Sequence, residues 1–151
     1  MEMVKLTIDG REVEIEKGKT ILDAARKIGI EIPTLCHMDL GKLKFVNKAA
    51  SCRICVVEVE GRRNLPPSCS TKAEEGMKVK TNTMRVLQAR KTVLELLISD
   101  HPKECLTCAK SGNCELQDLA EKFGIRDLPF EGGAMSEYRK DSSQSIIRDM
   151  D

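Results

Sequence analysis

The nine residues from Cys52 to Glu60, CRICVVEVE, join a metal-ligand motif to a strand pattern and decide how the first half of the chain folds. Cys52 and Cys55 form a Cys-x2-Cys pair, which can hold a metal centre from one tight loop. The run from Ile54 to Glu60 predicts a strand that ends at Gly61. A redox motif of the thioredoxin kind is the weaker interpretation, because such a motif opens a helix and this one leads into a strand.

Two further cysteines complete a candidate set of four metal ligands. Cys36 follows Pro33-Thr34-Leu35, and Cys69 follows Pro66-Pro67-Ser68, so both lie in loops where backbone N–H groups can point at sulfur. A [2Fe–2S] cluster needs four thiolates, two for each iron. A structural zinc site is the alternative, although zinc ribbons usually pair two Cys-x2-Cys knuckles and this set has one. The set is Cys36, Cys52, Cys55 and Cys69, spaced C-x15-C-x2-C-x13-C.

The residues before this set predict a hairpin. Val4–Asp9 and Glu12–Glu16 both alternate apolar with polar residues. Asp9-Gly10 lies between them and is the strongest short signal for a β-hairpin.

A helix and a further strand are predicted to complete this domain. Thr20 and Asp23 have the spacing of a capping box that opens a helix, and Gly29 is suited to its C-terminal end. Met77–Thr81 predicts another strand. The pattern fits an α+β domain with one helix packed on a small mixed sheet. The predicted buried face of the helix consists of Ile21, Leu22, Ala25 and Ile28.

A second set of ligands lies between two predicted helices, Thr83–Ser99 and Cys114–Phe123. Four soft or borderline ligands within fourteen residues form a closed metal site. Zinc held by three cysteines and one histidine fits this spacing as well as an iron–sulfur cluster does, so the residues alone leave the choice open. The set is His101, Cys105, Cys108 and Cys114, spaced H-x3-C-x2-C-x5-C.

The first of these helices has an apolar stripe with helical spacing. We expect the stripe to face the interior of the protein, with a docking surface as the alternative. Its members are Val86, Ala89, Val93, Leu94 and Leu97.

Composition excludes several classes of protein. Lys and Arg total 25 against 24 for Asp and Glu, which lacks the basic excess of a nucleic-acid-binding protein. No apolar run is long enough to span a membrane, and the N-terminus lacks the apolar core of a signal peptide, so we expect a cytoplasmic protein that is not embedded in a membrane. The 7 cysteines are odd in number, and in a reducing compartment they favour metal ligands over disulfides.

No motif for substrate chemistry is present. The chain has no Gly-rich dinucleotide fingerprint and no phosphate-binding loop. We therefore expect no catalytic residue in it, and the metal sites favour a one-electron relay.

Five motifs resemble one known family. His101–Cys108 (HPKECLTC) and Gly112–Asp118 (GNCELQD) resemble its histidine-ligated [4Fe–4S] motif. Pro33–Cys36 (PTLC), Cys52–Val59 (CRICVVEV) and Gly76–Thr81 (GMKVKT) are similar to landmarks of its [2Fe–2S] domain. The family comprises the large iron–sulfur subunit of respiratory NADH dehydrogenase, the diaphorase small subunit of NAD-linked hydrogenases, and the α subunits of NAD(P)-linked [FeFe]-hydrogenases and some formate dehydrogenases.

The resemblance implies an arrangement of domains. Residues 1–81 would form a ferredoxin-like β-grasp domain with a [2Fe–2S] cluster, and residues 82–127 a small helical domain with a histidine-ligated [4Fe–4S] cluster. Residues 128–151 would be a tail or linker toward a further cluster domain, because Ser145–Asp151 is similar to the segment that precedes further [4Fe–4S] clusters in the family. Family members often have a glycine before the Cys-Arg-x-Cys loop, where this chain has Ala49-Ala50-Ser51.

The resemblance also implies a function. The chain would be the electron-transfer part of a multisubunit NAD(P)H-linked oxidoreductase, foremost an [FeFe]-hydrogenase, since Gly61–Arg63 and Asn82-Thr83 are closer to that branch. Its partners would be a flavin-containing NAD(P)H-binding subunit, a thioredoxin-like [2Fe–2S] subunit, and further cluster or hydrogenase domains. The alternatives are a respiratory or formate-linked complex, a free-standing ferredoxin and a zinc-stabilised interaction module.

Overall fold

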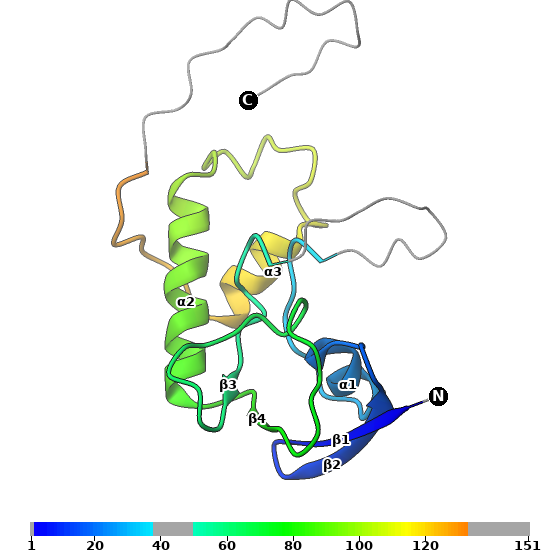
Figure 1. Ribbon diagram of the computed structural model, residues 1–151. Coiled ribbons are helices and arrows are strands. Elements are labelled where there is room, and N and C mark those ends of the chain that lie inside the picture. The colour runs from blue at the N-terminus through cyan, green and yellow to red at the C-terminus, as the bar shows by residue number, and fades with distance from the viewer. Residues whose placement is uncertain (1, 38–49, 133–151) are drawn as a thin grey trace, which may run out of the picture.

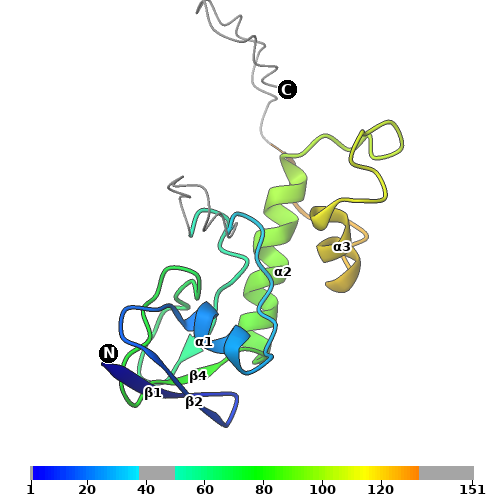
Figure 2. The same ribbon diagram turned by 90° about the vertical axis from the view of Figure 1, so that its right-hand side faces the viewer.

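The computed structural model describes residues 2–37 and 50–132. Figures 1 and 2 show the sheet and the first helix gathered around one end of the long helix α2, and the third helix beside its other half. Within the described ranges, no helix combines the length and apolar character needed to cross a membrane. The elements are β1 (Met3–Ile8), β2 (Arg11–Glu16), α1 (Ile21–Lys27), β3 (Glu58–Val59), β4 (Lys78–Lys80), α2 (Met84–Ser99) and α3 (Glu115–Lys122).

The predicted hairpin is confirmed. β1 pairs antiparallel with β2, and Asp9 and Gly10 turn the chain with φ values of 48° and 80°. Two successive residues with positive φ are what a tight hairpin turn requires, and Gly accepts this conformation without a steric penalty. The Asp9 carboxylate also accepts the backbone N–H of Thr81 at 2.7 Å, so the turn is tied to the strand that ends the domain.

The sheet is mixed, with the order β2-β1-β4-β3, because β4 pairs parallel with β1 and antiparallel with β3. Helix α1 begins at a capping box, in which Thr20 Oγ1 accepts the N–H of Asp23 and the Asp23 carboxylate accepts the N–H of Thr20. Ile21, Leu22 and Ala25 are fully buried, as predicted, and Ile28 packs against the core at its edge. The α+β prediction is confirmed.

The strand predicted over residues 54–60 is wrong in extent, because only Glu58–Val59 joins the sheet. The preceding residues pair instead with the segment before Cys69. The Val57 N–H donates to Pro66 O at 3.0 Å, and the Ser68 N–H donates to Cys55 O at 3.0 Å. Residues 54–57 are all buried rather than alternately exposed. This side pairing brings the two halves of the first cysteine set toward each other.

Helix α2 is anchored on this cysteine-bearing segment. Its N-cap Thr83 accepts the Val86 N–H and donates to Glu58 Oε2 at 2.6 Å. Val86 and Leu94 are fully buried, which confirms the predicted interior face there, whereas Leu97 is 36% exposed. The apolar stripe is therefore covered over the first three turns and opens toward the second cysteine set.

Helix α3 is attached more loosely. None of its residues is buried, although it packs against α2. The chain then returns to the end of α2, where Gly132 lies against the carbonyl of Ser99 with no room for a Cβ atom. The loop that carries the second ligand set is thus held at both ends but has little protein around it.

Candidate metal centres

The first cysteine set is assembled from three loops of the sheet domain. Cys55 and Cys69 are 1% and 4% exposed, while Cys36 and Cys52 are half-buried. The Cys52 N–H points at Cys36 Sγ, 3.4 Å away. None of the described cysteines forms a disulfide. Cys52 interacts with Cys36, and Cys69 interacts with both Cys55 and Cys36, so the structure brings all four predicted ligands near one another as thiols.

The loop before Cys55 adopts a conformation that L residues rarely take. Ala50 and Arg53 have φ values of 70° and 61°, in the left-handed region. Members of the resembled family often have a glycine at this place, so the geometry of the loop in this chain was an open question. Ala49 lies outside the described residues. The alanine takes up the backbone shape that glycine would favour, at a cost of about 1–2 kcal/mol. Tight backbone of this kind lets N–H groups approach sulfur.

Electrostatics in the first set favour a cation among the sulfurs. Burial and the adjacent Cys55 thiol raise the pKa of Cys69 to about 12, and burial raises the pKa of Cys52. Burial also opposes ionisation of Cys36, but hydrogen bonds from Cys52 and the Ser51 backbone hold its pKa below the ordinary value. Four thiolates can share this space only when positive charge offsets their repulsion, and bound iron would supply that charge.

Two buried polar atoms at this set have no hydrogen-bond partner in the described part of the chain. They are Ser68 Oγ, beside Cys69, and His37 Nδ1, beside Cys36. A buried hydroxyl without a partner is costly, and a Ser68 O–H aimed at an electron-rich sulfur would remove that cost. The unpaired Ser68 hydroxyl therefore fits an anionic group held by these cysteines, and so does His37 Nδ1 in the tautomer that carries its proton there.

The second ligand set surrounds a cavity of about 410 Å³ between the end of α2 and the start of α3. His101, Cys105 and Cys108 are exposed, and Cys114 is half-buried as the N-cap residue of α3. The Lys110 N–H approaches Cys108 Sγ at 3.4 Å. Apolar side chains of Ile98, Leu116 and Ala120 close the cavity. All four predicted ligands thus line one space.

The donors of the second set lie around a cavity rather than at one point. Zinc needs ligand atoms about 2.0–2.3 Å from one point. Across residues 2–37 and 50–132, no three His, Cys, Asp or Glu side chains converge closely enough to hold one ion. The four donors of the second set line a space of about 410 Å³, which has room for a polynuclear cluster.

Sequence reasoning missed one residue at the first site. Arg90 is 2% exposed, and its guanidinium binds the carbonyl of Val56, the residue after Cys55. The available signal was its spacing, because it lies four residues from both Val86 and Leu94 on the buried face of α2. A charge in an apolar stripe was overlooked because the stripe was defined by its hydrophobic members.

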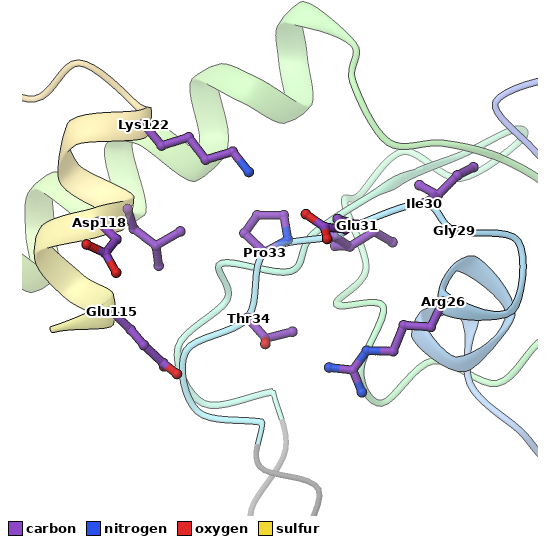
Figure 3. Close-up of a pocket in the computed structure, with 11 residues that line it drawn as sticks. Arg26, Gly29, Ile30, Glu31, Pro33, Thr34, Glu115, Asp118 and Lys122 are labelled. Atoms are coloured by element: carbon purple, nitrogen blue, oxygen red, sulfur yellow. The ribbon is translucent and has the colours of Figure 1, made fainter. Parts of the chain in front are cut away.

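A further cavity of about 530 Å³ lies between α3 and the segment that leads from α1 to Cys36. Figure 3 shows Glu115, Asp118 and Lys122 of α3 on one side of it, and Arg26 and Glu31 on the other. Charges of both signs line this space, so it favours no particular ligand charge.

Comparison with known proteins gives the class of protein. Residues 1–84 match the family model described as a 2Fe-2S iron-sulfur cluster binding domain, and residues 90–129 match the NADH-ubiquinone oxidoreductase-G iron-sulfur binding region. The chain is therefore an iron–sulfur protein with a [2Fe–2S] binding domain and a [4Fe–4S] binding region. It belongs to the family that includes the 75 kDa subunit of NADH-ubiquinone oxidoreductase and a subunit of NADP-reducing hydrogenase.

Three relatives define the match. The chain is 66% identical over 151 residues to NADP-reducing hydrogenase subunit HndD of Solidesulfovibrio fructosivorans, covering 100% of the chain and 26% of the relative. It is 40% identical over 138 residues to NADPH-Fe(3+) oxidoreductase subunit alpha of Geobacter sulfurreducens, covering 91% of the chain and 16% of the relative. It is 39% identical over 138 residues to the NADH-ubiquinone oxidoreductase 75 kDa subunit of Reclinomonas americana, covering 91% of the chain and 18% of the relative. The chain thus spans about a quarter or less of these relatives.

A solved structure has the same fold. The crystal structure of an NAD+-reducing [NiFe]-hydrogenase in the H2-reduced state matches with a TM-score of 0.77 and 34% identity. The match covers 93% of this chain and 56% of the other. The arrangement of the sheet domain and the helices is therefore shared with a chain of a known hydrogenase.

Proposed function

We propose that this chain is an electron relay with one [2Fe–2S] and one [4Fe–4S] cluster. The observation that carries the proposal is two cysteine-lined sites joined by one helix, in a chain that matches iron–sulfur families over both halves. Such clusters take up and release one electron at a time. We assign no catalytic residue. The ligands are Cys36, Cys52, Cys55 and Cys69 for the first cluster, and His101, Cys105, Cys108 and Cys114 for the second.

Within the first set we assign Cys36 and Cys52 to one iron and Cys55 and Cys69 to the other. The thiols of Cys36 and Cys52 interact with each other, and so do those of Cys55 and Cys69. A [2Fe–2S] cluster takes two thiolates on each iron, so two neighbouring pairs suit it.

We infer three segments from the fold and the positions of the ligands. Residues 1–81 form the [2Fe–2S] domain, 82–127 the helical [4Fe–4S] domain, and 128–151 a linker, of which residues 133–151 lie outside the described part. Support comes from the sheet closing at Thr81 through Asp9, while α2 begins at Met84. The bonds from α2 back to Glu58 and Val56 indicate that the first two segments also pack together.

We further propose that the chain serves an NAD(P)-linked [FeFe]-hydrogenase in the cytoplasm. The 66% identity to an NADP-reducing hydrogenase subunit supports this branch, and the match to a NADH-ubiquinone oxidoreductase subunit keeps a respiratory or formate-linked complex as the second candidate. The proposed partners are a flavin-containing NAD(P)H-binding subunit, a thioredoxin-like [2Fe–2S] subunit, and further cluster or hydrogenase domains.

Metal analysis of the full chain, purified without air, tests the cluster proposal. We expect about six iron atoms and about six acid-labile sulfides per chain, with a brown colour that bleaches on reduction. Zinc in stoichiometric amounts with little sulfide would show a zinc-stabilised module instead.

Reduction by nucleotide tests the assignment to a complex. We expect NADH or NADPH to reduce the clusters only after the flavin-containing subunit has been added, because the electrons must leave a hydride donor through a flavin. Dithionite should reduce them without any partner. Reduction by the nucleotide alone would contradict the proposed division of labour.

A further inference from the structure

Arg90 is a buried cation with no ion-pair partner among the described residues. Its side chain is 2% exposed, and the ion pairs of the described chain all lie elsewhere. Nε and Nη2 both donate to the carbonyl oxygen of Val56, at 3.1 and 2.7 Å. A carbonyl accepts hydrogen bonds but does not neutralise a charge. A guanidinium removed from water therefore needs a negative field from another source.

The surroundings of Arg90 point to the first metal site as that source. The guanidinium binds the carbonyl of the residue that follows Cys55, and although burial lowers the pKa of Arg90 to about 10, interactions with Cys55 and then Asp9 oppose this shift. Cys55 is a proposed cluster ligand and is itself 1% exposed. Asp9 is exposed and already holds Thr81 through both carboxylate oxygens. The guanidinium thus lies beside the peptide that follows Cys55, in a buried region where water does not screen it.

We propose that Arg90 is the internal counter-cation of the [2Fe–2S] site, which raises its reduction potential and holds the Cys55–Val56 backbone in place. This inference rests on the proposed [2Fe–2S] ligation. On reduction the site gains one electron from the donor and becomes one charge more negative, with no bond made or broken. A fixed positive charge nearby stabilises the reduced form more than the oxidised form, so the potential rises.

The positive charge near the first site comes from the helix that leads to the second site. Arg90 belongs to α2, whose other end leads to His101, so the helix of the second region supplies a tuning charge to the first site. The potential of the first cluster then depends on how α2 is docked.

Four variants of the full chain test the inference by EPR-monitored redox titration with dithionite. Arg90→Gln and Arg90→Met remove the charge, one with a polar end and one with an apolar chain that suits a buried helix position, while Arg90→Lys keeps the charge. Arg85→Gln is the matched control, because Arg85 lies on the same helix and also binds a backbone carbonyl, that of Arg63, but is exposed. Iron content, sulfide content and the thermal unfolding midpoint of each variant show whether a substitution changes the reduction potential itself or disturbs folding and cluster assembly.

We expect the neutral variants to make the [2Fe–2S] site about tenfold harder to reduce, which is a potential lower by about 59 mV for one electron. Arg90→Lys should stay nearer to the wild type, Arg85→Gln should match it, and the [4Fe–4S] potential should change little in all four. If the neutral variants fail to assemble the cluster while Arg90→Lys assembles it, the charge is required at the site, which also supports the inference.

Wild-type potentials in either neutral variant would overturn the inference, and so would equal shifts in the Lys and neutral variants. Failure of all three Arg90 variants to assemble the cluster would also overturn it, since shape rather than charge would then matter. The absence of a [2Fe–2S] signal from the wild-type protein would instead refute the ligand assignment, so the two failures are distinguishable.

Discussion

The first candidate metal site lies inside a folded domain, whereas the second lies in a surface loop. Cys55 and Cys69 are almost fully buried and are set by backbone pairing between residues 55–57 and 66–68. Cys105 and Cys108 are exposed, and α3 beside them buries no residue. The difference teaches that packing preorganises the first cysteine set, and we expect the second set to gain order when its cluster binds. It also suits a relay in which one centre is shielded and the other is open to a partner.

The largest expected effect is the loss of a single cluster. Cys105→Ala should abolish the [4Fe–4S] EPR signal and leave the [2Fe–2S] signal, because the sheet domain has its own core. Cys55→Ala should do the reverse. EPR spectra of the dithionite-reduced proteins measure both. Loss of both signals in Cys105→Ala would mean that the two regions fold as one unit and that the boundary near residue 81 is not a folding boundary.

Stability of the metal-free protein should differ between the regions. Leu22 is fully buried in α1, so Leu22→Ala should lower the free energy of unfolding by about 2–5 kcal/mol. Leu116 is only half-buried in α3, and Leu116→Ala should cost about 1 kcal/mol or less. Urea unfolding followed by circular dichroism compares them. Equal losses of unfolding free energy would show that α3 is packed as tightly as the sheet domain even when no metal is bound.

Replacing the proposed histidine ligand should change the reduction potential of the second centre and leave that of the first unchanged. Imidazole is neutral where thiolate is negative, so His101→Cys should lower the [4Fe–4S] potential, on the order of 100 mV. The [2Fe–2S] potential of the same protein serves as the internal control in the titration. An equal or higher [4Fe–4S] potential in the variant would contradict ligation by His101.

Backbone strain is expected at the first site but not in α2. Ala50→Gly should raise the free energy of unfolding by about 1 kcal/mol, because it relieves a positive φ. Ala89→Gly is the matched control, since Ala89 lies inside a regular helix, where glycine costs about 1 kcal/mol. Chemical denaturation gives both values. Destabilisation by both substitutions would show that the left-handed conformation of Ala50 is not strained.

The smallest effect concerns the capping box of α1. Burial works to raise the pKa of Asp23, but hydrogen bonds from Thr20, with Lys19 and His37 nearby, hold it below its ordinary value of 3.8. A carboxyl whose pKa is lowered by folding stabilises the protein above its unfolded pKa and loses this contribution as the pH falls through the folded pKa. Asp23→Asn should therefore cost about 0.5 kcal/mol at neutral pH, since asparagine can still accept the Thr20 N–H.

Unfolding of both proteins between pH 7 and pH 2 tests this expectation. The difference between wild type and Asp23→Asn should shrink toward the acid end. A difference that stays constant or grows on acidification would contradict it.

Local signals predicted most of the elements. The Asp9-Gly10 turn and the capping box at Thr20 each act within a few residues, and the apolar spacing over residues 83–99 repeats with each helical turn, so the hairpin, α1 and α2 occur where they were expected. The strand over residues 54–60 was not predicted correctly, because an apolar run does not show whether its backbone pairs with the sheet or with a distant loop. Here residues 66–68 pair with residues 55–57, so only Glu58–Val59 joins the sheet.

The sequence by itself determined the candidate ligands, their division into two sets and the capping box that begins α1, because each depends on residue type and short spacing. Only the tertiary structure decided which thiols are neighbours, how deeply each set is buried, and that Arg90 binds the peptide that follows Cys55. Burial and electrostatic field depend on residues far apart in the chain, such as Val56 and Arg90. Short-range patterns therefore predict what can bind a metal, and packing decides how strongly the protein tunes it.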